Sequence, residues 1–248
     1  MTVPQIDVDG RRLDVVRWGA PTPSIVFVHD GLGSIGQWRR IPERAAVASG
    51  LGVLAFNRSG HGRSLPIPTG AWPPDWISTE AEVLARLIEQ HCEGAVRLVG
   101  HSDGGSIALV CAARRPDLVT DVVAIASHTW VEDECLSAIS ALRRDSERLV
   151  ASLGMYHAAP AALFEAWSGG WTRPEFAGWD IRPELAEMPM PVTLVQGDRD
   201  EFATEEMLFG SAAAIGTSAK AVLLRDCGHI VHRDAPDVVV DLAAAPWN

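Results

Sequence analysis

Residues 100–104 constrain the fold of this chain more than any other stretch. They read Gly-His-Ser-Asp-Gly and fit the pattern Gly-x-Ser-x-Gly. A short apolar run of strand character precedes them, and an apolar run typical of a buried helix follows from Asp103 and stops at Arg115-Pro116. A serine between two such elements lies on a sharp turn with strained backbone angles, and glycines beside it avoid the neighbouring strand and helix. We therefore predict that Ser102 projects from a strand-to-helix turn into a cleft.

The same turn predicts a site for a negative charge beside Ser102. The backbone N–H of Asp103 opens the following helix, and the positive end of that helix would stabilise a developing oxyanion. The pattern Gly-x-Ser-x-Gly has low specificity by itself, so its value depends on the flanking strand and helix and on partner residues elsewhere. At position 103 we expect only the backbone to be used.

Apolar runs along the rest of the chain predict alternating strands and helices. The pair Asp9-Gly10 predicts a hairpin, Gly50 is expected to end a helix over 42–49, and Ser78 is the expected N-cap of a helix over 80–90. Continuous apolar runs predict buried strands at 24–29, 52–56, 121–127, 191–197 and 219–224. This alternation indicates a mostly parallel sheet with helices on both faces, with ligands bound at the carboxyl ends of the strands.

The interval from Thr129 to Met188 breaks this alternation. It reads as helical segments without a strand and is rich in tryptophan. We expect a helical cap (lid) at 129–188, inserted over the carboxyl edge of the sheet, and a core formed by 1–128 and 189–248. Plain packing between small helices is the alternative role for any one of the aromatic side chains.

Composition argues against several classes of function. The net charge of −11, from 21 Lys and Arg against 32 Asp and Glu, argues against nucleic acid or an anionic membrane as partner. Neither Cys-x-x-Cys, His-Glu-x-x-His nor Gly-x-Gly-x-x-Gly after a strand occurs, so no metal or nucleotide cofactor is expected. With no signal-peptide pattern and no apolar run of about 18 residues, we expect a cytoplasmic protein. A monomer or weak homodimer that acts on a small molecule is the expected state.

On its motifs the chain resembles proteins of the α/β-hydrolase fold over nearly its whole length. The resemblance rests on five segments, which are an oxyanion loop at 29–34, a loop similar to Arg-x-Gly-x-Gly-x-Ser at 57–64, the turn at 100–104, Gly-Asp-Arg-Asp at 197–200 and Gly-His at 228–229. It implies an α/β fold with a mostly parallel eight-stranded sheet, flanking helices and an inserted helical cap. The family's order of serine, acid and histidine implies Ser102, Asp200 and His229 as a catalytic triad.

Elementary chemistry supports the same three residues. A serine hydroxyl is a poor nucleophile near neutral pH, so it needs a base within hydrogen-bond reach, and histidine suits because its ordinary pKa is about 6.5. That base needs an acceptor on its other ring nitrogen, which fixes the tautomer and stabilises the imidazolium. Asp200 and His229 follow neighbouring predicted strands and would converge beside Ser102.

Each partner of Ser102 has a neighbour that could replace it. Asp198 lies nearer the strand end than Asp200, but the resemblance aligns the acid with the second aspartate. His232 lies beyond His229 and is expected to help start the final helix. His229 directly follows the glycine that ends the strand, so it is the preferred base.

The other histidines near the predicted site are expected to have supporting roles. His101 should pack behind Ser102, because side chains beside the nucleophile point elsewhere. His29 and His61 should hold their own loops, and His128, at the end of a strand near the cap, could contact substrate.

The second oxyanion donor is expected in the loop that follows the strand at 24–29. The resembling families carry His-Gly-x there and use the N–H of x, so Gly31 is the first candidate to act with Asp103, and Leu32 is the alternative. Asp30 replaces the family's glycine. A carboxylate facing an oxyanion would be costly, so Asp30 is expected to point away and bond a loop N–H or an arginine.

These residues predict a serine hydrolase that cleaves an ester or related acyl bond of a small, fairly apolar molecule. Its pocket wall is predicted to include Leu32, Trp130, Trp167 and Trp171. A thioesterase, lactonase, carbon–carbon bond hydrolase or acyltransferase would use the same triad, and a small-ligand receptor with vestigial hydrolysis is a further alternative. Relatives that open epoxides or displace halide carry an aspartate where Ser102 stands, so neither reaction is expected.

Overall fold

A computed structural model describes residues 3–186 and 188–246 of the chain. Over these residues eight strands form one sheet in the order β1-β2-β4-β3-β5-β6-β7-β8. β2 runs antiparallel to β1 and β4, and the other neighbouring strands are parallel. The mostly parallel eight-stranded sheet is therefore confirmed. The strands are β1 (Gln5–Val8), β2 (Arg11–Trp18), β3 (Pro23–Val28), β4 (Gly52–Phe56), β5 (Val96–His101), β6 (Val119–Ile125), β7 (Val192–Gly197) and β8 (Ala219–Leu224).

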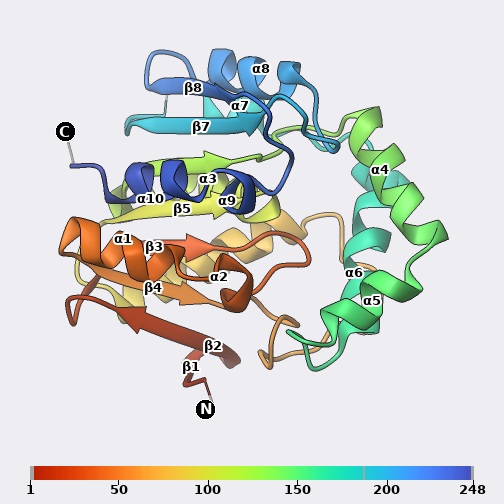
Figure 1. Cartoon of the computed structure of the whole chain (residues 1–248), viewed down its shortest axis with the longest axis horizontal. Coiled ribbons are helices and arrows are strands. Elements are labelled where there is room, and N and C mark those ends of the chain that lie inside the picture. The colour runs from red at the N-terminus through yellow and green to blue at the C-terminus, as the bar shows by residue number, and fades with distance from the viewer. Residues whose placement is uncertain (1–2, 187, 247–248) are drawn as a thin grey trace.

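Helices cover both faces of the sheet (Figure 1). One face packs against α1 (Ile41–Ser49), α9 (Val231–Asp234) and α10 (Pro236–Ala244). The other face packs against α2 (Trp76–His91), α3 (Asp103–Arg114) and α8 (Glu205–Ile215). Two apolar layers therefore sandwich the sheet, as expected for parallel strands that are buried on both faces.

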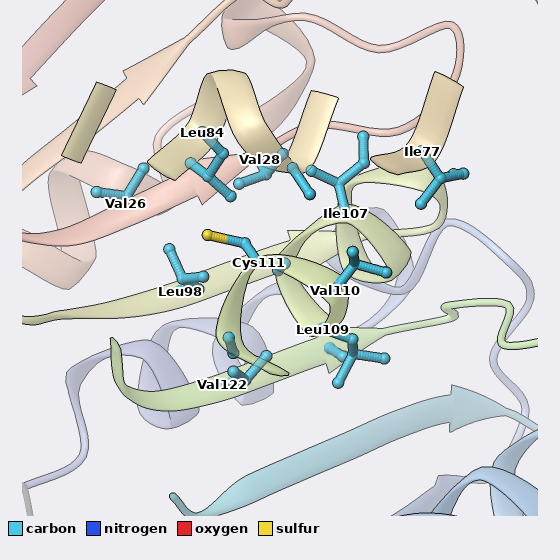
Figure 2. Packing of buried hydrophobic residues seen from close by; sticks show 14 of the residues in the cluster. Val26, Val28, Ile77, Leu84, Leu98, Ile107, Leu109, Val110, Cys111 and Val122 are labelled. Carbon is cyan, nitrogen blue, oxygen red and sulfur yellow. The ribbon is translucent and has the colours of Figure 1, made fainter. Parts of the chain in front are cut away.

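Alternation along the central strands builds these two layers. In β3, Val26 and Val28 lie in one hydrophobic cluster, whereas Ile25 and Phe27 lie in the other. Figure 2 shows strand side chains of the first cluster, with Leu98 of β5 among them, beside side chains from α2 and α3. Because successive strand residues point to opposite faces, one continuous apolar run supplies both layers.

The predicted hairpin and the predicted end of α1 are both present. Asp9 and Gly10 have φ values of 49° and 81°, as a two-residue turn with positive φ at both positions requires. Gly50 caps α1 with φ 71° in the left-handed region, where a side chain would be strained.

The predicted start of α2 is wrong. This helix begins at Trp76, four residues before the predicted range, and Ser78 lies inside it. Trp76 and Ile77 are buried in the core, and packing of these two side chains extends the helix toward its N-terminus. The Ser78 hydroxyl instead accepts a hydrogen bond from Arg114 Nη2 at 3.0 Å.

Helices fill the interval between β6 and β7. They are α4 (Asp133–Arg144), α5 (Glu147–Leu153), α6 (Pro160–Thr172) and α7 (Arg182–Leu185). In Figure 1, α4, α5 and α6 stand beyond the carboxyl ends of the strands. α7 instead packs against α3 and α8 beside the sheet. The division into a core and a cap at 129–188 stays a prediction. Within the described ranges, no helix is both long and apolar enough to cross a membrane.

Candidate active site

Ser102 occupies the turn between β5 and α3. Its φ of 52° and ψ of −123° lie in a region that non-glycine residues rarely adopt. The flanking glycines are required by contact: a Cβ at Gly104 would lie 2.2 Å from the carbonyl oxygen of Val28, and one at Gly100 would lie 2.3 Å from that of Gly104. The strand and helix approach too closely for any side chain at these positions.

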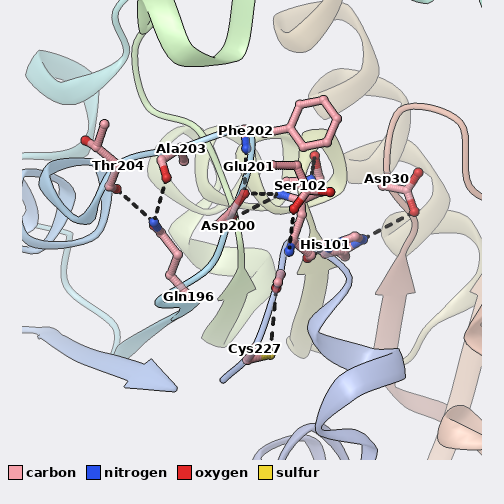
Figure 3. Close-up of polar contacts among 12 residues, drawn as sticks. Asp30, His101, Ser102, Gln196, Asp200, Glu201, Phe202, Ala203, Thr204 and Cys227 are labelled. Carbon is pink, nitrogen blue, oxygen red and sulfur yellow. Dashed lines mark hydrogen bonds and ion pairs between the residues drawn. The ribbon is translucent and has the colours of Figure 1, made fainter. Parts of the chain in front are cut away.

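The structure brings Ser102, His229 and Asp200 together from three loops at the carboxyl edge of the sheet. His229 Nε2 lies 3.0 Å from Ser102 Oγ. His229 Nδ1 lies 2.9 Å and 3.0 Å from the two carboxylate oxygens of Asp200. These contacts are among those drawn around Ser102 and Asp200 in Figure 3. The residues follow β5, β8 and β7 respectively, and these strands end at the same edge of the sheet.

The loop that carries Asp200 is fixed by polar contacts of its own. Asp200 Oδ1 accepts a hydrogen bond from the Phe202 N–H at 2.9 Å. Buried Gln196, in β7, donates from Nε2 to the Thr204 carbonyl at 2.8 Å, as Figure 3 shows. The ring of Phe202 lies 4.6 Å from that of His229 between centroids, so the loop also packs against the histidine.

Burial and charge have opposite effects on the pKa values of His229 and Asp200. Burial favours the neutral imidazole, but the hydrogen bond and the charge of Asp200 outweigh it and raise the pKa of His229 above its ordinary value. Burial alone would raise the pKa of Asp200, but the bond from His229 and the charge of that ring lower it. The imidazolium form of His229 is therefore stabilised by an ionised carboxylate.

The two competing residues do not make these contacts. The carboxylate of Asp200, and not that of Asp198, accepts the bond from His229 Nδ1. The ring of His232 lies 4.8 Å between centroids from both Trp38 and His101, and burial lowers its pKa to about 3. His232 lies in α9, which is the short helix that precedes the final helix α10.

Three further histidines hold loops around the site. His101 is fully buried behind Ser102, with Nδ1 3.2 Å from Asp30 Oδ2 and Nε2 2.9 Å from the His229 carbonyl oxygen. His29 Nε2 accepts the Arg58 N–H at 3.0 Å, and His61 contacts the carbonyl oxygen of Gly31 at 3.0 Å. Contacts from His101 and His61 therefore set the backbone positions of His229 and Gly31.

Two backbone N–H groups beside Ser102 are free to bind an anion. Within the described part of the chain, the N–H groups of Gly31 and Asp103 have no hydrogen-bond acceptor. The Leu32 N–H, the alternative donor, is occupied because it donates to Asp30 Oδ1 at 3.0 Å. Gly31 is therefore favoured over Leu32. The Asp30 carboxylate bonds this loop N–H and His101 rather than an arginine, and despite its burial the bond from His101 holds its pKa well below the usual range.

A cavity of about 420 Å³ opens beside Ser102. The predicted pocket residues Leu32, Trp167 and Trp171 line it, as does His128. Its wall also contains aliphatic side chains of α4 and α5 that sequence reasoning missed, namely Ile139, Leu142, Leu149 and Leu153. The spacing of Cys135, Ile139 and Leu142 at i, i+4 and i+7 was the available signal for one apolar helix face.

Trp130 does not line this cavity, so its predicted role in the pocket wall is wrong. The residue pairs with Asp180 in an isolated β-bridge, and its ring lies 4.3 Å from the guanidinium carbon of Arg182. A Cβ built on Gly210 in α8 would lie 3.0 Å from the same ring, so the ring lies beside that helix. These contacts hold Trp130 against the helices beside the sheet, away from the space under α4 to α6.

Comparisons with known proteins agree with this architecture. A sequence model of the alpha/beta hydrolase family matches residues 25–242. An esterase of Mycobacterium tuberculosis is 26% identical over 97% of this chain and 88% of its own length. The 2-(acetamidomethylene)succinate hydrolase of Mesorhizobium japonicum is 24% identical over 93% of this chain and 92% of its own length. The solved thioesterase domain from the curacin biosynthetic pathway aligns with a TM-score of 0.76, 22% identity and 99% coverage of each chain, which shows a shared fold.

Proposed function

Since the chain belongs to the alpha/beta hydrolase family, we propose that it is a serine hydrolase that cleaves an ester or related acyl bond of a small, fairly apolar molecule. The observation that carries this proposal is the 3.0 Å separation of Ser102 Oγ and His229 Nε2, with Asp200 bonded to the other ring nitrogen. A hydroxyl in contact with an oriented base is the arrangement that acyl transfer to serine requires.

In the proposed mechanism Ser102 Oγ attacks the substrate carbonyl carbon while its proton passes to His229 Nε2. Asp200 keeps the ring in the tautomer that can accept this proton and stabilises the imidazolium. His229 then gives the proton to the leaving group, and the acyl group stays on Ser102. A water molecule, deprotonated by His229, then attacks the acyl-enzyme. The imidazolium returns this proton to Ser102 Oγ as the bond between Ser102 and the acyl group breaks and the acid is released.

The N–H groups of Gly31 and Asp103 are the proposed oxyanion hole. Both lie beside Ser102 without an acceptor in the described chain, and the Asp103 N–H lies at the positive end of α3. A donor of this kind contributes about 3 kcal/mol to stabilisation of the transition state. Strain at Ser102 supports the same arrangement, because the turn aligns the hydroxyl and the N–H of the next residue toward one point.

The aliphatic and aromatic part of the cavity wall supports an apolar acyl group. We propose that α4, α5 and α6 act as a cap, because their side chains close the cavity over Ser102. Aliphatic side chains of α4 and α5 and the rings of Trp167 and Trp171 of α6 line one cavity that is large enough for a small molecule. Thioester, lactone or carbon–carbon bond substrates and acyl transfer would use the same three residues, and a ligand receptor with vestigial hydrolysis would close over a ligand in the same way.

A panel of p-nitrophenyl esters of increasing acyl length tests the proposed function. We expect release of p-nitrophenol with an optimum acyl length set by the cavity. Leu142 lines the cavity, so its replacement by tryptophan should abolish hydrolysis of the longer esters. Failure to hydrolyse any ester, combined with tight binding of a ligand detected by a thermal shift, would favour the receptor alternative.

The pH profile should show an acidic limb set by His229. Only the neutral imidazole can accept the Ser102 proton, so kcat/KM should fall as pH decreases through the pKa of His229. Because Asp200 raises that pKa, the limb should be centred above the ordinary histidine value of about 6.5. Measurement of kcat/KM from about pH 5 to pH 9 checks this expectation. A limb centred well below the ordinary value would contradict the assignment of His229 as base.

A further inference from the structure

The side chain of Asp103 is a polar group in the cavity wall that the proposed mechanism does not use. Asp103 is 1% exposed and lines the cavity beside Ser102. Its Oδ1 accepts a hydrogen bond from Trp171 Nε1 at 3.2 Å. Its Oδ2 is buried and has no hydrogen-bond partner in the described chain. The sequence predicts that only the backbone of this residue is used. The unpaired side-chain oxygen is a feature that this prediction does not include.

The unpaired oxygen lies beside Gly31, the residue that carries one of the two proposed oxyanion donors. A Cβ built on Gly31 would lie 2.5 Å from Asp103 Oδ2. The other proposed donor is the N–H of Asp103 itself. An acyl group whose carbonyl oxygen binds these two N–H groups would therefore have its first carbons close to the unpaired oxygen.

A second unpaired atom lies in the same wall. His128 is 1% exposed, and its buried Nδ1 has no hydrogen-bond partner in the part of the chain that the structure describes. Its ring lies 5.2 Å from that of Trp171 and 6.1 Å from that of His229 between centroids. Burial lowers the pKa of His128 to about 3, so the ring is neutral and offers one donor and one acceptor. Trp171 thus packs beside both of the residues that carry an unpaired atom.

The charges in this wall favour a neutral polar partner. Burial raises the pKa of Asp103 to about 7, so near neutral pH the carboxyl is present in both forms. A hydroxyl both donates and accepts, so it can pair with either form. Ionised Asp103 would repel a carboxylate. The rest of the cavity wall carries both signs, with Asp30 and Glu201 opposed by Arg39 and Arg233, so it does not favour an ionised ligand.

We propose that Asp103 and His128 are specificity-determining residues that bind a hydroxyl group on the acyl part of the substrate, at the first or second carbon beyond the reacting carbonyl. This inference rests on the proposed function and names its substrate class, a hydroxyacyl ester or related acyl compound. The rest of the acyl chain extends along the aliphatic side chains of α4 and α5.

The unpaired atoms explain why such a substrate is selected. A substrate without the hydroxyl leaves a buried carboxyl oxygen and a buried ring nitrogen without partners, and sites of this kind discriminate strongly against the analogue that lacks the polar group. We expect a preference of roughly 10- to 100-fold in kcat/KM for the hydroxylated acyl group.

Matched esters test the inference. For each protein, kcat/KM is measured with p-nitrophenyl octanoate and with its 2-hydroxy and 3-hydroxy analogues, and each value is divided by the rate of hydrolysis by hydroxide. One hydroxylated ester should be preferred by the intact protein. Asp103→Ala and His128→Ala should each reduce that preference at least about fivefold, and Asp103→Asn should retain most of it because an amide keeps a donor and an acceptor.

The readout is the ratio between two esters, so it does not depend on how much activity a variant keeps. Leu142→Ala is the matched control, because Leu142 lines the same cavity without a polar atom, and it should leave the ratio unchanged. Equal use of all three esters by the intact protein, or a preference that survives in Asp103→Ala, would overturn the inference while leaving the proposed function intact. Hydrolysis of none of the esters would overturn the proposed function, and this inference with it.

Discussion

Replacement of Ser102 by alanine is expected to lower kcat for ester hydrolysis by roughly 10⁶-fold, to the level of the uncatalysed reaction assisted by binding alone. The variant loses the only atom that forms the acyl-enzyme, and His229 Nε2 loses the hydroxyl that lies 3.0 Å away. Alanine fits the turn, so the fold should persist, which circular dichroism and the thermal midpoint of unfolding can verify.

A matched control tests whether replacement of a serine by alanine elsewhere in the chain lowers activity. Ser137 is an exposed serine in α4, and Ser137→Ala should retain full activity and stability. If Ser102→Ala hydrolyses esters as fast as the unmodified protein after removal of contaminating esterases, Ser102 is not the nucleophile.

The second large effect is expected at Asp200. Asp200→Asn should lower kcat by roughly 10⁴-fold, because an amide that donates to His229 Nδ1 favours the wrong tautomer and cannot stabilise the imidazolium. Asp198→Asn is the matched control two residues away, and its carboxylate does not bond His229. That variant should change kcat by less than about threefold. Steady-state kinetics of both variants decide the assignment, and the reverse ranking would make Asp198 the acid.

Local patterns were sufficient to predict the sheet and the turn at Ser102. The central strands are continuous apolar runs, and a run of this kind in a parallel sheet is buried on both faces whatever its neighbours are. The turn needs glycines because backbone atoms approach within contact distance. Gly100 and Gly104 in the sequence meet this need, so the turn can be predicted from them. The resemblance to the family, through its order of serine, acid and histidine, implies that Ser102, Asp200 and His229 meet.

Features that depend on packing between distant elements could not be predicted in this way. The start of α2 is set by burial of Trp76 and Ile77, which a search for capping residues does not detect. Its position in a tryptophan-rich interval predicts a pocket role for Trp130, yet its packing against Arg182 and beside α8 arises only from the folded arrangement. Similarly, nothing local to the turn reveals that the Asp103 side chain meets Trp171.

The site of reaction with a fluorophosphonate probe is the most direct test of the central claim that Ser102 is an activated nucleophile. The intact protein should gain one phosphonyl group, and mass spectrometry of its peptides should locate that group on Ser102. The adduct should be absent from Ser102→Ala and form far more slowly in His229→Ala, because the serine then lacks its base. No adduct on the folded protein, or an adduct at another residue, would contradict the account.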